Sequence, residues 1–420
     1  MTLDPVHFSG ITGLVQRVRH DIDEEEHRDE ARRVWDDYLD PLYHDGDPVM
    51  EPIGDQTRYA VDMQEAGVQA SPFPTVHGID SGTINPRQFK NGLVLDVAQA
   101  AMSVTPSDVD VHRRRTVVAT VHASDDTVTF TDGPGVDDWD KNDGGYWRGR
   151  IYRAPTVERD EQSVVHALSL YLAESQHALD NHEQVRDCLV LDGPIYPKLV
   201  LSWLDEHPEL ARLTEEDDLT TTAIQNYLEL AETFIERDVP LVGFVKNVQS
   251  RGLVRALDDK PELTVPWTDD AGFYTQILER RERTRDGFDR ITDDLTYTNW
   301  FVSRMGYDRV VSRLGDRLSL PKDRDPADYE VAFFIVYDPR TDVTYKVETP
   351  RAFAEDEAVR DRITQHVVAE VAANAGPPTS VAKADELARI SQTEKAELVP
   401  ALSDALDSDE RVTYDDERWG

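Results

Sequence analysis

Two aspartates in this chain each end a short apolar run and are followed by glycine or turn-forming residues. Asp80 ends the run that begins at Thr75, and Asp192 ends the run that begins at Cys188. An apolar strand that stops at such a residue places its carboxylate at the carboxyl edge of a sheet, where α/β proteins build their sites. Two neighbouring carboxylates do not both stay ionised unaided, so they hold a divalent cation or keep a proton. The pair therefore predicts a metal-dependent site.

A third acidic residue, Glu174, lies on the long helix predicted for residues 158–184, between the two strands. A helix that crosses the sheet can present this carboxylate over the same edge as Asp80 and Asp192. Three oxygen ligands suit Mn²⁺ or Mg²⁺, which keep open positions for water and phosphate. Two such ions can activate a water molecule and stabilise the leaving oxygen of a phosphodiester. Taken singly, each aspartate is also typical of an ordinary turn, and Glu174 of a solvated helix residue.

The order of the predicted elements indicates how these acids are positioned. Strands are predicted over residues 76–80, 93–98 and 116–121, followed by a loop at 132–149 and by the helix and strand that lead to Asp192. A meander of three strands followed by alternating helix and strand is typical of a ribonuclease-H-like fold, in which the first and fourth strands are neighbours. We therefore predict an α/β protein with a ribonuclease-H-like mixed sheet flanked by helices, with an unspecified α/β domain as the alternative.

The two ends of the chain are predicted to be helical. Residues 1–68 form an N-terminal helical arm, because Phe8, Ile11 and Leu14 recur at helical spacing, and this arm either packs on the main body or docks a partner. A hairpin is predicted over residues 330–347. The chain is helical again from about residue 356, with a break at Gly376-Pro377-Pro378, and ends in an acidic tail over 406–420.

The composition is strongly acidic. The 420 residues include 83 Asp and Glu against 45 Lys and Arg, for a net charge of -38, and the acids are spread along the chain. This pattern is typical of a halophilic protein, whose self-repulsion is screened by salt. In such a cell acidity does not exclude a nucleic-acid substrate. The single cysteine, Cys188, excludes an internal disulfide, and with no apolar signal core or membrane-length run we expect a soluble, cytoplasmic protein without membrane attachment.

Three motifs occur in the order seen in the archaeal NurA nuclease family, which the chain resembles over residues 70–400. The resemblance implies a ribonuclease-H-like fold, a homodimer, and a manganese-dependent DNA nuclease with exonuclease and single-strand endonuclease activity. It also implies a partnership with the hexameric ATPase HerA in resection of double-strand break ends, and a nuclease domain over residues 69–405. The motifs are Gly78-Ile79-Asp80-Ser81-Gly82, Leu191-Asp192-Gly193-Pro194 and Val242-Gly243-Phe244-Val245-Lys246.

The resemblance also assigns roles to residues. Asp80, Glu174 and Asp192 match the family's metal ligands, and Lys246 is placed to contact a DNA phosphate or to balance the carboxylates. The family usually carries a Tyr-Pro pair and then an Ala-His pair near its C-terminus. Here Pro377 replaces the tyrosine and Asp385 the histidine. Asp385 can still bind a hard cation through oxygen, whereas Pro377 offers no hydroxyl, which leaves the catalytic rate and the choice between manganese and magnesium open.

Two other functions compete with the nuclease. The first motif also resembles the phosphate loop of actin-like ATPases and sugar kinases, but Pro194 occupies a position where their second loop needs glycine, and no Gly-rich adenosine loop follows. The second alternative is a non-catalytic dimeric adaptor of the ATPase ring, which the lost tyrosine and histidine motivate. Several other residues allow either DNA contact or an ordinary structural role, and these are Arg113–Arg115, Arg280, Arg281, Arg283, Arg285, Trp267, Phe273 and Tyr274.

Overall fold

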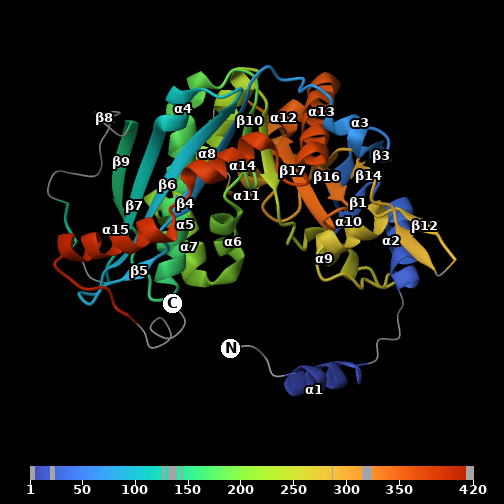
Figure 1. Cartoon of the computed structure of the whole chain (residues 1–420), viewed down its shortest axis with the longest axis horizontal. Helices are drawn as coiled ribbons and strands as arrows, with labels where there is room; N and C mark the ends of the chain where they lie inside the picture. The colour runs from blue at the N-terminus through green and yellow to red at the C-terminus, as the bar shows by residue number, and fades with distance from the viewer. Residues whose placement is uncertain are drawn as a thin grey trace.

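A mixed sheet of fifteen strands runs through the molecule (Figure 1). The computed structural model describes residues 5–18, 24–124, 128–130, 140–142, 145–285, 287–314 and 324–412. Along the main path of the sheet the strand order is β1-β2-β15-β16-β17-β11-β10-β4-β6-β7-β9-β8, while β14 and β3 extend from β16, and β5 pairs with β6. The predicted α/β class, with a central mixed sheet flanked by helices, is confirmed.

The half of the sheet that carries the predicted acids begins with an antiparallel meander. β4 (Val76–Thr83) pairs with β6 (Val94–Thr105), and β6 pairs with β7 (Arg114–His122). β10 (Leu189–Asp192) lies parallel to β4, so the first and fourth predicted strands are neighbours, and β11 (Leu241–Val245) lies beyond it. This order matches the one that motivated the ribonuclease-H-like assignment, which itself remains a prediction.

One predicted loop contains strands. The described part of residues 132–149 includes β8 (Asp140–Asn142) and the start of β9 (Gly145–Arg153), which lies parallel to β7. The glycine and aspartate content of this segment favoured a loop. Pairing with the exposed edge of β7 outweighs that local preference, because a strand edge presents unpaired backbone groups that a further strand satisfies.

Helices cover both faces of this half. α5 (Glu161–Asn181) and α8 (Asp218–Glu236) pack in the larger apolar core, where Val164, Leu168 and Leu172 are fully or almost fully buried at helical spacing. α13 (Glu357–Asn374) and α14 (Thr379–Ala388) contribute to the second core on the opposite face. The predicted break between these two helices is confirmed.

The N-terminal prediction is wrong in part. Beyond α2 (Glu24–Tyr38), the chain forms the strands β1 (Leu42–His44), β2 (Asp47–Pro52) and β3 (Arg58–Asp62). β2 pairs with β15 (Phe301–Ser303) and β3 with β14 (Asp294–Thr298), so this segment belongs to the sheet and not to a helical arm. The alternation of apolar and polar residues over such short strands was too brief to be separated from a helical pattern.

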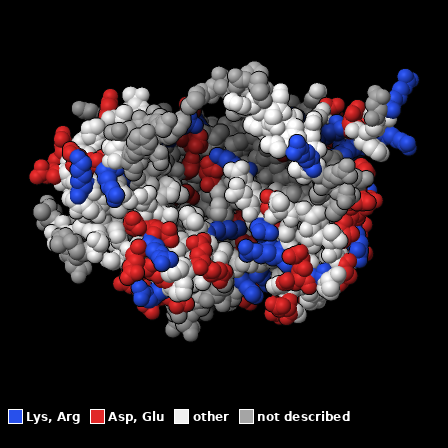
Figure 2. Space-filling view, turned by 90° about the horizontal axis from the view of Figure 1, so that it is seen from below, with Lys and Arg blue, Asp and Glu red and all other residues white. Residues whose placement is uncertain are grey.

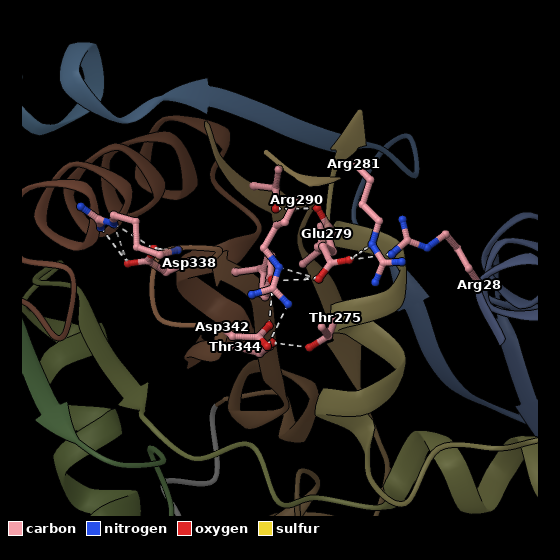
Figure 3. A network of polar contacts seen from close by, with 12 residues as sticks. Arg28, Thr275, Glu279, Arg281, Arg290, Asp338, Asp342 and Thr344 are labelled. Atoms are coloured by element: carbon pink, nitrogen blue, oxygen red, sulfur yellow. Dashed lines mark hydrogen bonds and ion pairs between the residues drawn. The ribbon is translucent and has the colours of Figure 1, made fainter. Parts of the chain in front are cut away.

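Helix α2 is fixed to the body by an ion pair between Arg28 and Glu279, 2.7 Å apart (Figure 3). By contrast, α1 (Pro5–Val15) lies below the body in Figure 1, and its apolar side chains are exposed. Phe8 is 66% and Leu14 62% exposed, so of the two alternatives for the arm, packing on the body does not hold for this helix.

The hairpin predicted over residues 330–347 is confirmed as β16 (Val331–Asp338) and β17 (Val343–Pro350). Among the described residues, no helix combines the length and apolar character needed to cross a membrane. Seen from below, the surface is hollowed near its middle, with acidic side chains on one wall of the hollow and Lys and Arg along its rim (Figure 2). The remaining elements are α3 (Met63–Gly67), β5 (Arg87–Gln88), α4 (Val109–Arg113), α6 (Lys198–Glu206), α7 (Pro208–Glu216), α9 (Gly252–Asp258), α10 (Asp270–Leu278), β12 (Arg281–Arg283), β13 (Phe288–Arg290), α11 (Val310–Leu314), α12 (Arg351–Ala354) and α15 (Gln392–Ala405).

Candidate metal centre

Asp80 and Asp192 lie side by side at the centre of the sheet. The parallel pairing of β4 with β10 reaches Ile79 opposite Leu191, and the two aspartates are the next residue on each strand. Since successive side chains alternate between faces, both carboxylates lie on the face covered by α13 and α14. One detail of the prediction is corrected: β4 continues to Thr83, so Asp80 lies within its strand and not at the end.

Two glycines explain how a helix comes close to this pair. Gly78 and Gly82 lie on the same face of β4 as Asp80, two residues to either side of it. A Cβ atom at Gly78 would lie 2.2 Å from the carbonyl oxygen of Ser380, and one at Gly82 would lie 2.4 Å from that of Ala388. Only glycine therefore allows the backbone of α14 to lie against the strand. The Gly-x-Asp-x-Gly spacing is a packing requirement as well as a motif.

This close packing adds Asp385 of α14 to the pair. One oxygen from each of Asp80, Asp192 and Asp385 lies within 4.8 Å of the others, so the three could hold one metal ion. Asp385 is also bonded to Arg389 one helical turn later, with 3.0 Å between the guanidinium and Oδ2. Three converging carboxylate oxygens are the donor set that hard divalent cations prefer.

The carboxylates of the centre resist ionisation. Burial and, after it, the nearby charge of Asp192 raise the pKa of Asp80 to about 7, against a hydrogen bond from the backbone N–H of Ser81. Burial also raises the pKa of Asp192, although Lys246 opposes this shift. The Nζ of Lys246 donates to Oδ2 of Asp192 at 2.6 Å. Lys246 alone therefore does not balance the negative charge of the carboxylates at this centre.

Glu174 approaches from the other face of the sheet, on α5. Its side chain is buried and accepts hydrogen bonds from the hydroxyl of Tyr227 at 3.1 Å and from Oγ of Ser81 at 3.3 Å. Burial, followed by the charges of Asp80 and Asp192, raises the pKa of Glu174 to about 8. The structure thus brings Glu174 next to the pair but outside the group of three converging oxygens, and its role as a ligand remains a prediction.

The sequence did not predict the residues that donate hydrogen bonds to Glu174. Tyr227 lies on α8, more than fifty residues from Glu174, and no local signal marks it. Ser81 stood beside Asp80 in the first motif, and its alternation to the opposite face of the strand could have indicated contact with the helix. Glu348, to which the sequence assigned no role, is fully buried and paired with Lys198 and Lys346.

Several residues for which the sequence allowed either DNA contact or a structural role make contacts within the protein. Trp267, Phe273 and Tyr274 are buried in the larger core, so base stacking is not open to them. Arg115 bonds to backbone carbonyls of its own segment. Among the arginines near residue 280, Arg281 and Arg283 lie on the strand β12, and Arg281 pairs with Glu279 (Figure 3).

The fold and the three carboxylates define a mixed-sheet α/β protein with a candidate divalent-metal site. The chain belongs to the NurA family, since the family model described as NurA domain matches residues 74–390. Comparison with curated protein sequences gives no match.

Solved structures similar to this chain include the following three. The NurA nuclease from Sulfolobus solfataricus has 12% sequence identity and a TM-score of 0.44, with 84% of this chain and 87% of that chain covered. A NurA structure with manganese has 10% identity and a TM-score of 0.39, covering 82% and 93%. A NurA structure bound to dAMP and manganese has 9% identity and a TM-score of 0.36, covering 96% and 98%.

Proposed function

We propose that the chain is a manganese-dependent deoxyribonuclease that hydrolyses the phosphodiester bonds of DNA, with magnesium as the alternative ion. The observation that carries the proposal is the convergence of oxygens from Asp80, Asp192 and Asp385 within 4.8 Å. Their surplus negative charge fits a divalent cation, because an ion removes the repulsion that now favours protonation. Membership of the NurA family supports a nuclease.

The residues of the chain divide the work of binding and proton transfer. Asp80 and Asp192 release their protons to bind the ion together with Asp385, and Lys246 favours the ionised form of Asp192. When bound, the ion would lower the pKa of a water molecule and polarise the phosphate. Glu174, held by Tyr227 and Ser81, is placed to complete the ligand shell or to accept a proton from that water.

The finer assignments rest on the NurA resemblance. They are exonuclease and single-strand endonuclease activity, a homodimer, and action with a HerA-type hexameric ATPase in the resection of DNA double-strand break ends. The net charge of -38 supports a protein that works in the cytoplasm of a halophilic archaeon, where salt screens repulsion between the acidic surface and DNA.

A non-catalytic adaptor is the second candidate, because Pro377 stands where the family carries a tyrosine. The raised pKa values argue against it. An inactive site gains nothing from keeping several poorly compensated carboxylates together, since each buried charge without a partner lowers stability.

The test is cleavage of labelled single-stranded and duplex DNA in molar salt, with Mn²⁺ or with a chelator. The native chain should cut in Mn²⁺ alone, and Asp80→Ala should not. Equal cleavage by both proteins would remove Asp80 from the mechanism. No cleavage by the native chain, with or without the ATPase, would favour the adaptor.

A further inference from the structure

A cavity of about 320 Å³ adjoins the candidate metal centre. Asp80 and Asp385 contribute to its lining, and so do three basic or ionisable groups, namely His166, Arg389 and Lys395. The wall of this cavity thus carries basic side chains beside the acids of the metal centre, in a chain with a net charge of -38. An anion is the ligand that this wall attracts.

The basic groups are displaced from the acids by whole helical turns. His166 lies eight residues before Glu174 on α5, which is about 12 Å along the helix axis and on the same face. Arg389 follows Asp385 by one turn, and Lys395 lies on the next helix, α15. The cavity therefore joins the metal centre to basic groups, of which Arg389 lies against Asp385 while His166 lies about two helical turns from Glu174.

His166 is held in place by a buried carboxylate. Oδ2 of Asp96 lies 2.9 Å from Nδ1 of His166, and Oδ1 of Asp96 accepts from the backbone N–H of Val97 at 2.8 Å. The Asp96 side chain is fully buried, whereas that of His166 is 35% exposed. Engaging Nδ1 fixes the imidazole ring and leaves Nε2, which donates a hydrogen bond to a phosphate when the ring is protonated. Burying the Asp96 carboxylate costs free energy, and holding the partly exposed His166 ring in one orientation is useful where that ring binds a ligand.

We propose that His166 and Lys395 bind a backbone phosphate of a single DNA strand, one or more nucleotides away from the phosphate that is cut. This inference rests on the proposed nuclease function and adds the course of the substrate strand. Asp96 acts as a positioning residue for His166. Arg389 gives up its bond to Asp385 when that carboxylate binds an ion, and then contributes to the same wall.

The experiment compares Lys395→Gln and His166→Ala with the native chain. A labelled single-stranded oligonucleotide serves as the probe, for cleavage in Mn²⁺ and for fluorescence anisotropy with a chelator. Both variants should raise KM and Kd about three- to tenfold and leave kcat within about twofold. Loss of the Lys395 contact should also reduce the slope of log Kd against log salt by about 0.7. His166→Gln, which retains a hydrogen-bonding group, should recover part of the affinity.

Lys383→Gln is the matched control. Lys383 lies on α14, and its Nζ bonds to Ser107 at 2.5 Å, so its removal changes the same charge without altering the cavity wall. Asp96→Asn should raise KM less than His166→Ala does.

The outcomes separate this inference from the nuclease assignment. A native chain that cuts DNA, with KM and Kd unchanged in both variants, would overturn the phosphate site and leave the nuclease intact. A fall in kcat at unchanged KM would also overturn it, since the groups would then act on the reacting phosphate. A native chain that binds but never cuts, with weaker binding in both variants, would refute the nuclease and support the strand site.

Discussion

Two buried carboxylate sites in this protein differ in what balances their charge. At the first, Glu279 accepts hydrogen bonds from Arg28 and Arg290, each at 2.7 Å, and from Arg281 (Figure 3). Burial alone would raise the pKa of Glu279, but the hydrogen bonds from Arg28 and Arg281, together with the charges of Arg281 and Arg290, outweigh burial and leave the pKa lowered. Three guanidinium groups thus more than balance one carboxylate.

At the second site, the candidate metal centre, the balance is reversed. Burial and mutual repulsion raise the pKa of Asp80 to about 7 and of Glu174 to about 8, while Lys246 donates its hydrogen bond to Asp192. The comparison shows that this fold can neutralise a buried carboxylate where structure requires it. The surplus charge at the metal centre is therefore a property to be explained by a ligand, and a divalent cation is the ligand that the donor set fits.

The largest effect should follow from breaking the balanced site. Glu279→Gln leaves the buried Arg28 without its carboxylate, and we expect the free energy of unfolding to fall by about 3–5 kcal/mol. Urea unfolding in molar salt measures this loss. Glu25→Gln is the control, because Glu25 is half-exposed and 3.9 Å from Arg281, and it should change stability by less than about 0.5 kcal/mol. Similar losses in the two variants would contradict the role given to Glu279.

At the metal centre, substitutions should lower activity without lowering the free energy of unfolding. Asp192→Asn should lower Mn²⁺-dependent cleavage by at least about 100-fold, because it removes a ligand, yet it should not lower stability in a chelator. Asp385→Asn should lower cleavage less, by about tenfold, since this carboxylate is 43% exposed and already pairs with Arg389. Cleavage assays and urea unfolding of the same proteins provide both readouts. A loss of metal-free stability in Asp192→Asn comparable with that of Glu279→Gln would remove the contrast.

The pH dependence sharpens the contrast further. With a pKa of about 8, Glu174 keeps in the folded protein a proton that the unfolded chain releases near pH 4 to 5. Metal-free stability should therefore fall as pH rises from about 5 to 8, and the gain on adding Mn²⁺ should grow over the same range. Glu174→Gln should flatten the metal-free curve, with about 1–3 kcal/mol recovered at pH 8. Urea midpoints at several pH values test this, and parallel curves for the two proteins would contradict it.

Much of the candidate metal centre could be predicted from the sequence. An apolar run ending in an acid is a local signal, and it located Asp80, Asp192 and their neighbouring strands. The motif resemblance supplied Asp385, which lies beside them because Gly78 and Gly82 admit α14.

Contacts between elements far apart in the chain could not be predicted from the sequence. The contact of Tyr227 with Glu174 joins two helices whose relative rotation no local pattern encodes. The short strands β2 and β3 are stabilised by pairing with residues near 300, a long-range effect that overrides local propensity.

The smallest predicted effect concerns Lys246, the lysine that pairs with Asp192 at the metal centre. Lys246→Gln removes the partner of Asp192, whose pKa should then rise further, so that Mn²⁺ has to displace a proton held more tightly. Because the Lys246 side chain is one-third exposed, solvent screens the pair and the effect should stay near 1 kcal/mol, or about five- to tenfold in the Mn²⁺ concentration for half-maximal cleavage. The shift should shrink as pH rises, since hydroxide then removes the competing proton. A uniform loss of kcat at saturating Mn²⁺, independent of pH, would instead assign Lys246 to the substrate phosphate.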